Sequence, residues 1–202
     1  FLNISKSKRL SSEVYRHIKA KELIVTDHPV VVTGNSTVDN NNQPAWIAKW
    51  LRNTFVNEKL VSDSNEKKKI YIDRSDKSEQ NPLRTIANEK EVKQVLKEKN
   101  FTEVKLHEIS FKDQVNLFYN AECVVGLHGA GFANLVFSKE GTKVIELRSI
   151  TSGDSIKNIS RKNNFDYNPI VVESKQIHKT NYPMQQGSHR IPIDDLIAKV
   201  ES

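Results

Sequence analysis

Residues 122–148, ECVVGLHGAGFANLVFSKEGTKVIELR, decide the fold of this 202-residue chain. They predict a buried strand over 123–127, a glycine turn at 128–131, a short helix that ends at 139–141, and a second buried strand over 143–147. A strand that opens into a turn and a helix leaves backbone N–H groups without partners at the helix start. With the helix dipole behind them, these groups suit a phosphate or another anion.

Strands and helices alternate on both sides of this segment. Further strands are predicted over 69–73, 102–109 and 168–172, and helices over 88–99, after a capping Ser110, over 155–164 and over 193–200. Strands that alternate with helices of about ten residues indicate an α/β fold, a Rossmann-like parallel sheet with helices on both faces.

The first third of the chain lacks this alternation. Apolar residues at spacings of three and four predict a helix over 45–56. An amphipathic helix from about Ser11 and short strands over 23–25 and 30–32 are also predicted. The change of pattern places an organisational boundary near residue 65.

The composition limits the possible partners. A net charge of +6 allows an anionic partner, but the 31 basic residues are spread along the chain, with 67–69 the only tight run. No apolar run approaches the 18 residues expected of a membrane span. The single Cys123 lies in an apolar strand and is expected to be a buried thiol, which is consistent with a reducing compartment.

Polar residues follow each predicted strand of the regular region. Parallel sheets bind ligands beyond the carboxyl ends of their strands, so we expect these residues at one rim. They are Arg74 after the first strand, His107 and Glu108 at the second, His128 at the third, and Glu146 with Arg148 at the fourth.

His128 is open to three interpretations, since it lies between an apolar strand and two glycines. It can contact a ligand, cap the helix or act as a general base. Gly129 and Gly131, on either side of Ala130, permit close approach of the backbone to a ligand. The spacing G-x-x-G-x-G from Gly126 is by itself a weak signal.

Glu146 is open to two interpretations, as a carboxylate for ribose hydroxyls or as the partner of Arg148. Arg74 follows a strand and Arg84 lies in a loop before a helix. Guanidinium groups placed there suit a diphosphate, although either can be an ordinary surface residue.

Asn88 and Glu89 begin a predicted helix, so capping and a favourable dipole interaction are their default roles. The remaining histidines do not cluster with one another or with Cys123 at ligand spacing. The sequence therefore supports no metal site.

Four stretches together resemble a known family. They are KIYIDRSD (69–76), RTIANEKEV (84–92), SFKDQVNLFYNAECVVGLHGAGFANLVF (110–137) and GTKVIEL (141–147). In order and spacing they resemble the bacterial, surface-polysaccharide members of glycosyltransferase family 61. That family also includes plant xylan arabinosyl- and xylosyltransferases and animal protein O-linked GlcNAc transferases.

The resemblance implies a metal-free, generally inverting enzyme of GT-B type, whose C-terminal Rossmann-like domain binds the nucleotide-sugar donor. Residues 1–65 then correspond to a remnant of the acceptor domain and a linker, and 66–202 to the donor domain. A UDP-sugar is the expected donor, with no tightly bound cofactor. The donor-binding positions that carry over are Arg74, Arg84, Asn88, Glu89, His128, Gly129, Ala130, Gly131, Asn134 and Glu146.

An inverting transfer needs a base for the acceptor hydroxyl and a clamp for the leaving diphosphate. Arg74, Arg84 and the N–H groups after His128 form the expected clamp. The catalytic base is expected on the missing acceptor domain, with His128 a further candidate. The resemblance also implies a glycan acceptor, no nucleic acid, a bacterial cytoplasmic enzyme and room for peripheral membrane association.

Two other functions fit parts of the pattern. An NAD(P)-dependent oxidoreductase would use Gly126, Gly129, Gly131 and Glu146. The dinucleotide fingerprint usually opens the fold, however, and this turn follows the third strand. A polyanion-binding module would explain the basic balance, but the chain lacks a basic stripe with interleaved aromatic residues.

Overall fold

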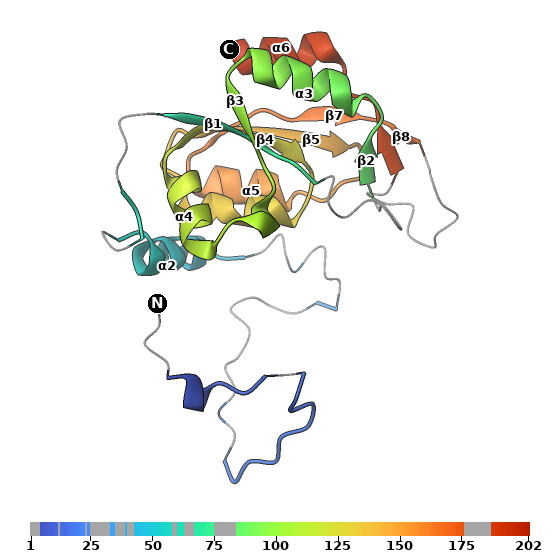
Figure 1. Ribbon diagram of the computed structural model, residues 1–202. Coiled ribbons are helices and arrows are strands. Elements are labelled where there is room, and N and C mark those ends of the chain that lie inside the picture. Colours follow the sequence, from blue (N-terminus) through green and yellow to red (C-terminus); the bar gives the residue numbers. More distant parts are fainter. Residues whose placement is uncertain are drawn as a thin grey trace.

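The computed structural model describes residues 5–11, 13–22, 24, 33–34, 39, 43–57, 60–62, 67–74, 84–175 and 187–202. Its main sheet has six strands in the order β3-β1-β4-β5-β6, with β7 also paired to β5, and every pair is parallel (Figure 1). The strands are β1 (Lys68–Ile72), β3 (Phe101–Val104), β4 (Ala121–Leu127), β5 (Lys143–Ser149), β6 (Asp166–Tyr167) and β7 (Ile170–Val172). The predicted Rossmann-like α/β fold is confirmed.

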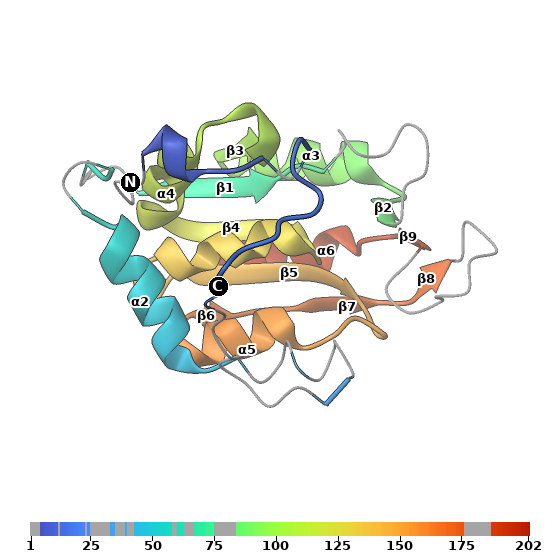
Figure 2. The same cartoon turned by 90° about the horizontal axis from the view of Figure 1, so that it is seen from below.

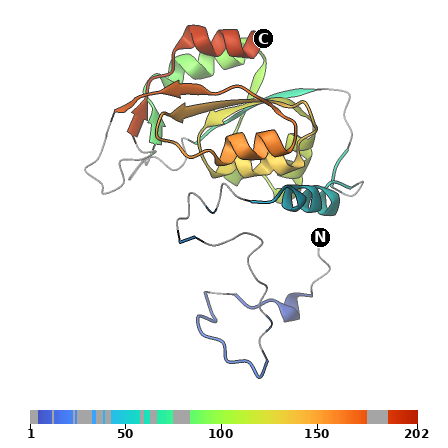
Figure 3. The same ribbon diagram turned by 180° about the vertical axis from the view of Figure 1, so that it is seen from behind.

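Helices cover both faces of this sheet (Figures 1 and 3). One face carries α3 (Glu89–Glu98) and α6 (Ile193–Glu201). The other carries α2 (Ala45–Phe55), α4 (Phe111–Tyr119), α5 (Ser155–Lys162) and the 3-10 helix η4 (Ala130–Phe137). Because side chains of a strand alternate, Ile145 and Leu147 of β5 pack toward α3 and α6, and Val144 packs toward the other layer.

The order of the strands creates a switch point between β1 and β4. From β1 the chain crosses to β3 on one side, and then returns to place β4 on the other side of β1. The connections that leave β1 and β4 therefore diverge, and ligands of open α/β sheets bind in the crevice that results. Arg74 follows β1 and His128 follows β4, so both lie at this point.

Helix α2 packs on the same layer as η4 and α5 (Figure 2). Ala48 is buried against that layer, and the Arg52 Nε donates to the carbonyl oxygen of Val136 at 3.0 Å. The predicted helix over 45–56 is thus confirmed. The domain boundary expected near residue 65 stays a prediction.

The structure shows the helix cap predicted at Ser110 and the end of the helix predicted at 139–141. Ser110 Oγ accepts the Asp113 N–H at 3.2 Å and bonds the Asp113 carboxylate at 2.6 Å, which caps α4 as predicted. After η4 the chain turns at Gly141, whose φ of +80° is a left-handed conformation that favours glycine.

The strand predicted over 102–109 is shorter than expected. It ends at Val104, and Leu106–Glu108 form the 3-10 helix η3. A second sheet of β2 (Arg84–Ile86), β9 (Gly187–His189) and β8 (Ser174–Lys175) has no counterpart in the sequence prediction. Its strands have two or three residues, too few to show a period.

The amphipathic helix predicted from about Ser11 is wrong for the residues described there. Among residues 5–11 and 13–22, which the structure describes, the 3-10 turn η1 (Lys6–Lys8) is the only helix, and Val14 and Ile18 are exposed. Without a surface to pack on, a helix this short is unstable. The strands predicted over 23–25 and 30–32 lie outside the described residues except for Ile24, which is exposed. Within the part of the chain described above, no helix is long and apolar enough to span a membrane.

Candidate functional site

Two arginines from different strands converge on the turn after β4. The Arg74 guanidinium, just beyond β1, donates to the carbonyl oxygen of His128 at 3.0 Å. Arg84, the first residue of β2, donates to the same oxygen. The structure therefore brings together three of the predicted site residues at the switch point of the sheet.

The arginine pair carries an excess of positive charge. Among the described residues neither guanidinium forms an ion pair with a carboxylate, and the buried Nε of Arg84 has no hydrogen-bond partner. Burial, reinforced by the charge of Arg74, lowers the pKa of Arg84, while Glu146 acts in the opposite direction. Two guanidinium groups this close to each other favour the binding of an anion that hydrogen-bonds both of them.

Gly129 makes room for this arrangement. A Cβ on Gly129 would lie 1.9 Å from a terminal nitrogen of Arg74, so any side chain would displace the guanidinium. At Gly131 a Cβ would meet Ile72 and Leu106 at 3.1 Å, so this glycine lets η4 pack closely on β1. Only the first of the two glycines adjoins the arginines.

Behind the turn lies a buried polar network. Nδ1 of His128 hydrogen-bonds one carboxylate oxygen of Glu146, and the Tyr167 hydroxyl donates to the other. A terminal nitrogen of Arg148 lies 3.7 Å from the same second oxygen. Burial and then the charge of Glu146 raise the pKa of Tyr167, which keeps its hydroxyl a donor.

The position predicted for Glu146 is corrected. It lies in the middle of β5, opposite Gly126, and not at the end of the strand. Its side chain is fully buried and both oxygens have protein partners, so it does not face a ribose. The other interpretation, a carboxylate paired with Arg148, describes it.

Asn88 is also placed differently from the donor-binding role that the resemblance implies. It precedes α3, but its side chain makes no capping bond. Its amide instead exchanges two 2.9 Å hydrogen bonds with the backbone of Ile191, ahead of α6. The amide also donates to the Glu91 carboxylate of α3 at 3.0 Å, so both of its donor hydrogens have protein partners, and this buried side chain ties the two helices of that face together.

Asn134 and the pair His107–Glu108 lie away from the arginines. The Asn134 amide donates to Gln114 of α4 at 3.1 Å, and His107 and Glu108 are exposed in η3. Glu89 does lie beside Arg74 and Arg84, where it lines a small hollow and pairs with Lys93 at 3.4 Å. The single rim expected from the sequence thus holds only in part.

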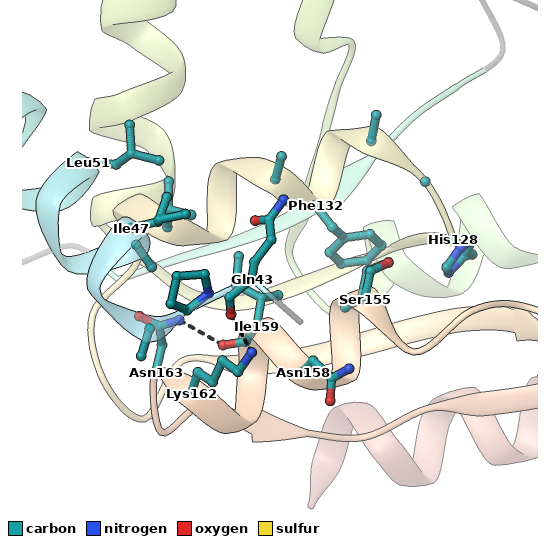
Figure 4. A pocket seen from close by; sticks show the side chains of 18 of the residues that line it. Gln43, Ile47, Leu51, His128, Phe132, Ser155, Asn158, Ile159, Lys162 and Asn163 are labelled. Carbon is teal, nitrogen blue, oxygen red and sulfur yellow. Dashed lines mark hydrogen bonds between the residues drawn. The ribbon is translucent and has the colours of Figure 1, made fainter. Parts of the chain in front are cut away.

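A cavity of about 330 Å³ opens beside the turn, between α2, η4 and α5 (Figure 4). One wall is apolar, and the other carries polar side chains of α5. The apolar wall includes Ile47, Leu51, Phe132 and Val136. The side of α5 carries the polar residues Ser155, Asn158, Lys162 and the following Asn163, together with Ile156 and Ile159. His128, Gly129, Ala130 and Arg84 complete the lining, and His128 lies at one end in Figure 4.

Sequence reasoning missed this cavity and Tyr167. The α2 wall comes from before the predicted boundary, and Tyr167 belongs to a two-residue strand. One signal was present, since Glu146 and Arg148 are two residues apart in a strand and so share a face. Across the described residues no group of three or more His, Cys, Asp or Glu side chains could hold a metal ion.

Fold and site together define a Rossmann-like domain with a cationic site at its switch point and a mixed apolar and polar cavity beside it. Residues 8–145 match the family described as Glycosyltransferase 61, and the chain belongs to that family. It is also similar to the EGF domain-specific O-linked N-acetylglucosamine transferase of Gallus gallus, with 27% identity over 111 residues. This match covers 52% of the chain and 20% of the relative, so the chain spans about a fifth of that protein.

Proposed function

We propose that this chain is the donor-binding part of a GT-B-type glycosyltransferase, which moves a sugar from a nucleotide-sugar to a glycan or protein acceptor with inversion. The observation that carries the proposal is the convergence of Arg74 and Arg84 on the turn at His128 without a carboxylate partner among the described residues. A leaving diphosphate needs its charge balanced, and two guanidinium forks supply this without a metal.

The backbone contributes to the same site. The N–H groups of Ala130 and Gly131 at the start of η4 have no intrahelical partner, whereas the Phe132 N–H already donates to the Gly129 carbonyl oxygen. The two N–H groups lie next to the arginines, since Gly129 contacts Arg74. The diphosphate would therefore lie between the two guanidinium groups and the start of η4. Membership of the glycosyltransferase family supports a nucleotide-sugar as the ligand.

A UDP-sugar is the donor class that we propose, supported by the N-acetylglucosamine transfer named for the Gallus gallus relative. We further propose a role in bacterial surface-polysaccharide assembly at the cytoplasmic side, with peripheral membrane association. The basic, disulfide-free composition supports this placement.

Calorimetric titration of the folded chain with UDP tests the proposal. We expect saturable UDP binding that Arg74→Met weakens and the matched control Arg161→Met, on the exposed side of α5, leaves unchanged. NADH serves as the competing ligand. Binding of NADH without UDP would favour the oxidoreductase, and no binding of any nucleotide by folded protein would remove the donor-domain proposal.

A further inference from the structure

The ring of His128 has one nitrogen engaged and one available. Its Nδ1 bonds the Glu146 carboxylate, which only accepts hydrogen bonds when ionised, so Nδ1 carries the proton. In the neutral ring Nε2 is then an acceptor with a lone pair. Nε2 has no hydrogen-bond partner among the described residues and is not an enclosed atom, and His128 lines the cavity.

The carboxylate that fixes this tautomer is itself held in place. Tyr167 donates to its second oxygen, and Arg148 lies within 3.7 Å of that oxygen. Arg148 is anchored in turn by Asp154 at 3.2 Å and by the carbonyl oxygen of Ser152. A histidine oriented through one nitrogen by a secured carboxylate, with the other nitrogen open, is the arrangement that general-base catalysis uses.

The charges around His128 are arranged on different sides of the residue. Glu146, Tyr167 and Arg148 lie behind Nδ1, while Arg74 and Arg84 contact its main-chain carbonyl. Burial lowers the pKa of His189, hydrogen bonds to the backbone oppose this, and the charges of Arg84 and then His128 lower it further. The positive charge that His128 gains when Nε2 takes up a proton is therefore balanced by the Glu146 carboxylate. The guanidinium groups of Arg74 and Arg84 remain available for an anion.

We propose that His128 is the general base of the transfer reaction, and that Glu146 and Tyr167 are its positioning residues. This inference rests on the proposed glycosyltransferase function. Nε2 takes the proton of the acceptor hydroxyl as that oxygen bonds to the anomeric carbon. The bond from that carbon to the diphosphate breaks, and its electron pair leaves with the nucleoside diphosphate toward Arg74 and Arg84.

The same geometry assigns the cavity to the acceptor. A sugar ring has an apolar face and polar edges, and the cavity offers Ile47 and Phe132 on one wall and Ser155 and Asn158 on the other. Because Nε2 belongs to a residue at the end of this space, an acceptor hydroxyl that enters the cavity reaches the base.

The decisive experiment separates donor binding from chemistry in the whole enzyme. UDP affinity is measured by calorimetry, and turnover as release of UDP from UDP-N-acetylglucosamine with water as the acceptor. His128→Gln keeps a hydrogen-bond donor but cannot take up a proton. We expect UDP affinity within about twofold of the parent and release slowed by about 10²–10⁴-fold. His107→Gln, in the exposed η3, is the control and should match the parent.

The outcomes distinguish the two proposals. A parent enzyme that binds no UDP would refute the proposed function. If the parent binds UDP and His128→Gln is just as active, His128 is not the general base. If His128→Gln loses UDP affinity and UDP release in parallel, His128 is also not the base and instead contacts the phosphates or supports the structure.

Nitrogen-15 NMR of the histidine rings gives a readout that does not depend on the donor sugar. We expect the UDP-bound protein at neutral pH to show His128 protonated at Nδ1 and unprotonated at Nε2. A proton on Nε2 under these conditions would overturn the proposal.

Tyr167→Phe tests the positioning role. It removes the hydroxyl that donates to Glu146. We expect kcat to fall by about five- to tenfold, the equivalent of one hydrogen bond, while KM stays unchanged. The acidic limb of the pH–rate profile should also shift. Tyr119→Phe, which removes a hydroxyl distant from the site, is the control and should change none of these. A proportional change in KM without a shift of the pH profile would argue for a merely structural tyrosine.

Discussion

The two faces of strand β5 differ in polarity: one carries apolar side chains and the other carries charged ones. Ile145 and Leu147 point toward α3 and α6, where they are fully buried among apolar side chains. Glu146 and Arg148 alternate with them and point toward the layer of η4 and α5. There Arg148 pairs with Glu146, and Glu146 bonds His128, which lines the cavity. We name these the closed face and the cavity face. One strand thus supplies both a core and a polar network.

This difference separates the groups that stabilise the fold from those available for chemistry. Apolar burial on the closed face stabilises directly. A buried ion pair gains little net stability, because desolvation of both charges offsets their attraction. The polar network of the cavity face is therefore better explained by the orientation it gives His128 than by its contribution to stability.

The largest effect is expected from Arg148→Met on the cavity face. Arg148 contacts Glu146, Asp154 and Tyr167, and its loss removes the guanidinium that pairs with the fully buried carboxylate of Glu146. We expect the free energy of unfolding to fall by about 3–5 kcal/mol in urea denaturation.

A double-mutant cycle provides the control for Arg148→Met. Adding Glu146→Gln removes the stranded charge and should restore part of the lost stability. If the two losses simply add, the pair is not coupled, and the distinction between the two faces fails.

The next effect is expected one residue away, at Leu147→Ala on the closed face. The cavity left in the core should lower the free energy of unfolding by about 2–5 kcal/mol. UDP affinity of the folded protein should stay unchanged, because Leu147 points away from the site. Val171→Ala, at an exposed position of β7, is the control and should change neither quantity. A loss of UDP affinity in Leu147→Ala would show that the faces are not separate.

The sequence predicted the closed face well. Continuous apolar strands and helices of period 3.6 are local patterns, and together they fix which residues meet in the core of a parallel sheet. The prediction failed where no local pattern exists. The strands of the second sheet, with two or three residues each, are too short to show one. Val14 and Ile18 have a helical spacing but no surface to cover.

The cavity face was predicted only in part. Arg74 and His128 were placed correctly at the rim, since both follow strands that flank the switch point. The position of Glu146 within its strand was not predicted correctly, because the strand continues three residues beyond it to Ser149. Tyr167 meets Glu146 only through tertiary packing between β5 and β6, and no spacing in the sequence encodes that contact.

Arg84→Met should lower binding without lowering stability. Arg84 is half-buried next to the like charge of Arg74, and its buried Nε lacks a partner, so its removal costs the fold little. UDP affinity should fall by about 10–100-fold, the equivalent of one charge-assisted hydrogen bond at about 1.5–3 kcal/mol. Calorimetry and urea denaturation measure the two quantities, with Arg161→Met as the exposed control. Unchanged UDP affinity would exclude Arg84 from the diphosphate site.

The smallest effect is expected on the closed face, where ionisation of Cys123 at alkaline pH lowers the free energy of unfolding. Burial raises the pKa of this thiol from 9.0 to about 12. The folded state then holds the proton more tightly than the unfolded state, so this stabilisation is complete below pH 9 and is lost as the pH rises from 9 toward 12. The expected loss at pH 10 relative to pH 7 is on the order of 1 kcal/mol.

Urea denaturation of the parent and of Cys123→Ala at pH 7 and pH 10 measures this loss. Burial raises the pKa of Tyr71 and Tyr167 as well, and their alkaline losses remain in both proteins and cancel in the comparison. Equal pH dependence in the two proteins would contradict the assignment to Cys123. Saturating UDP should not change the difference between them, because Cys123 packs with the core between the sheet and α3 and α6 and not with the site.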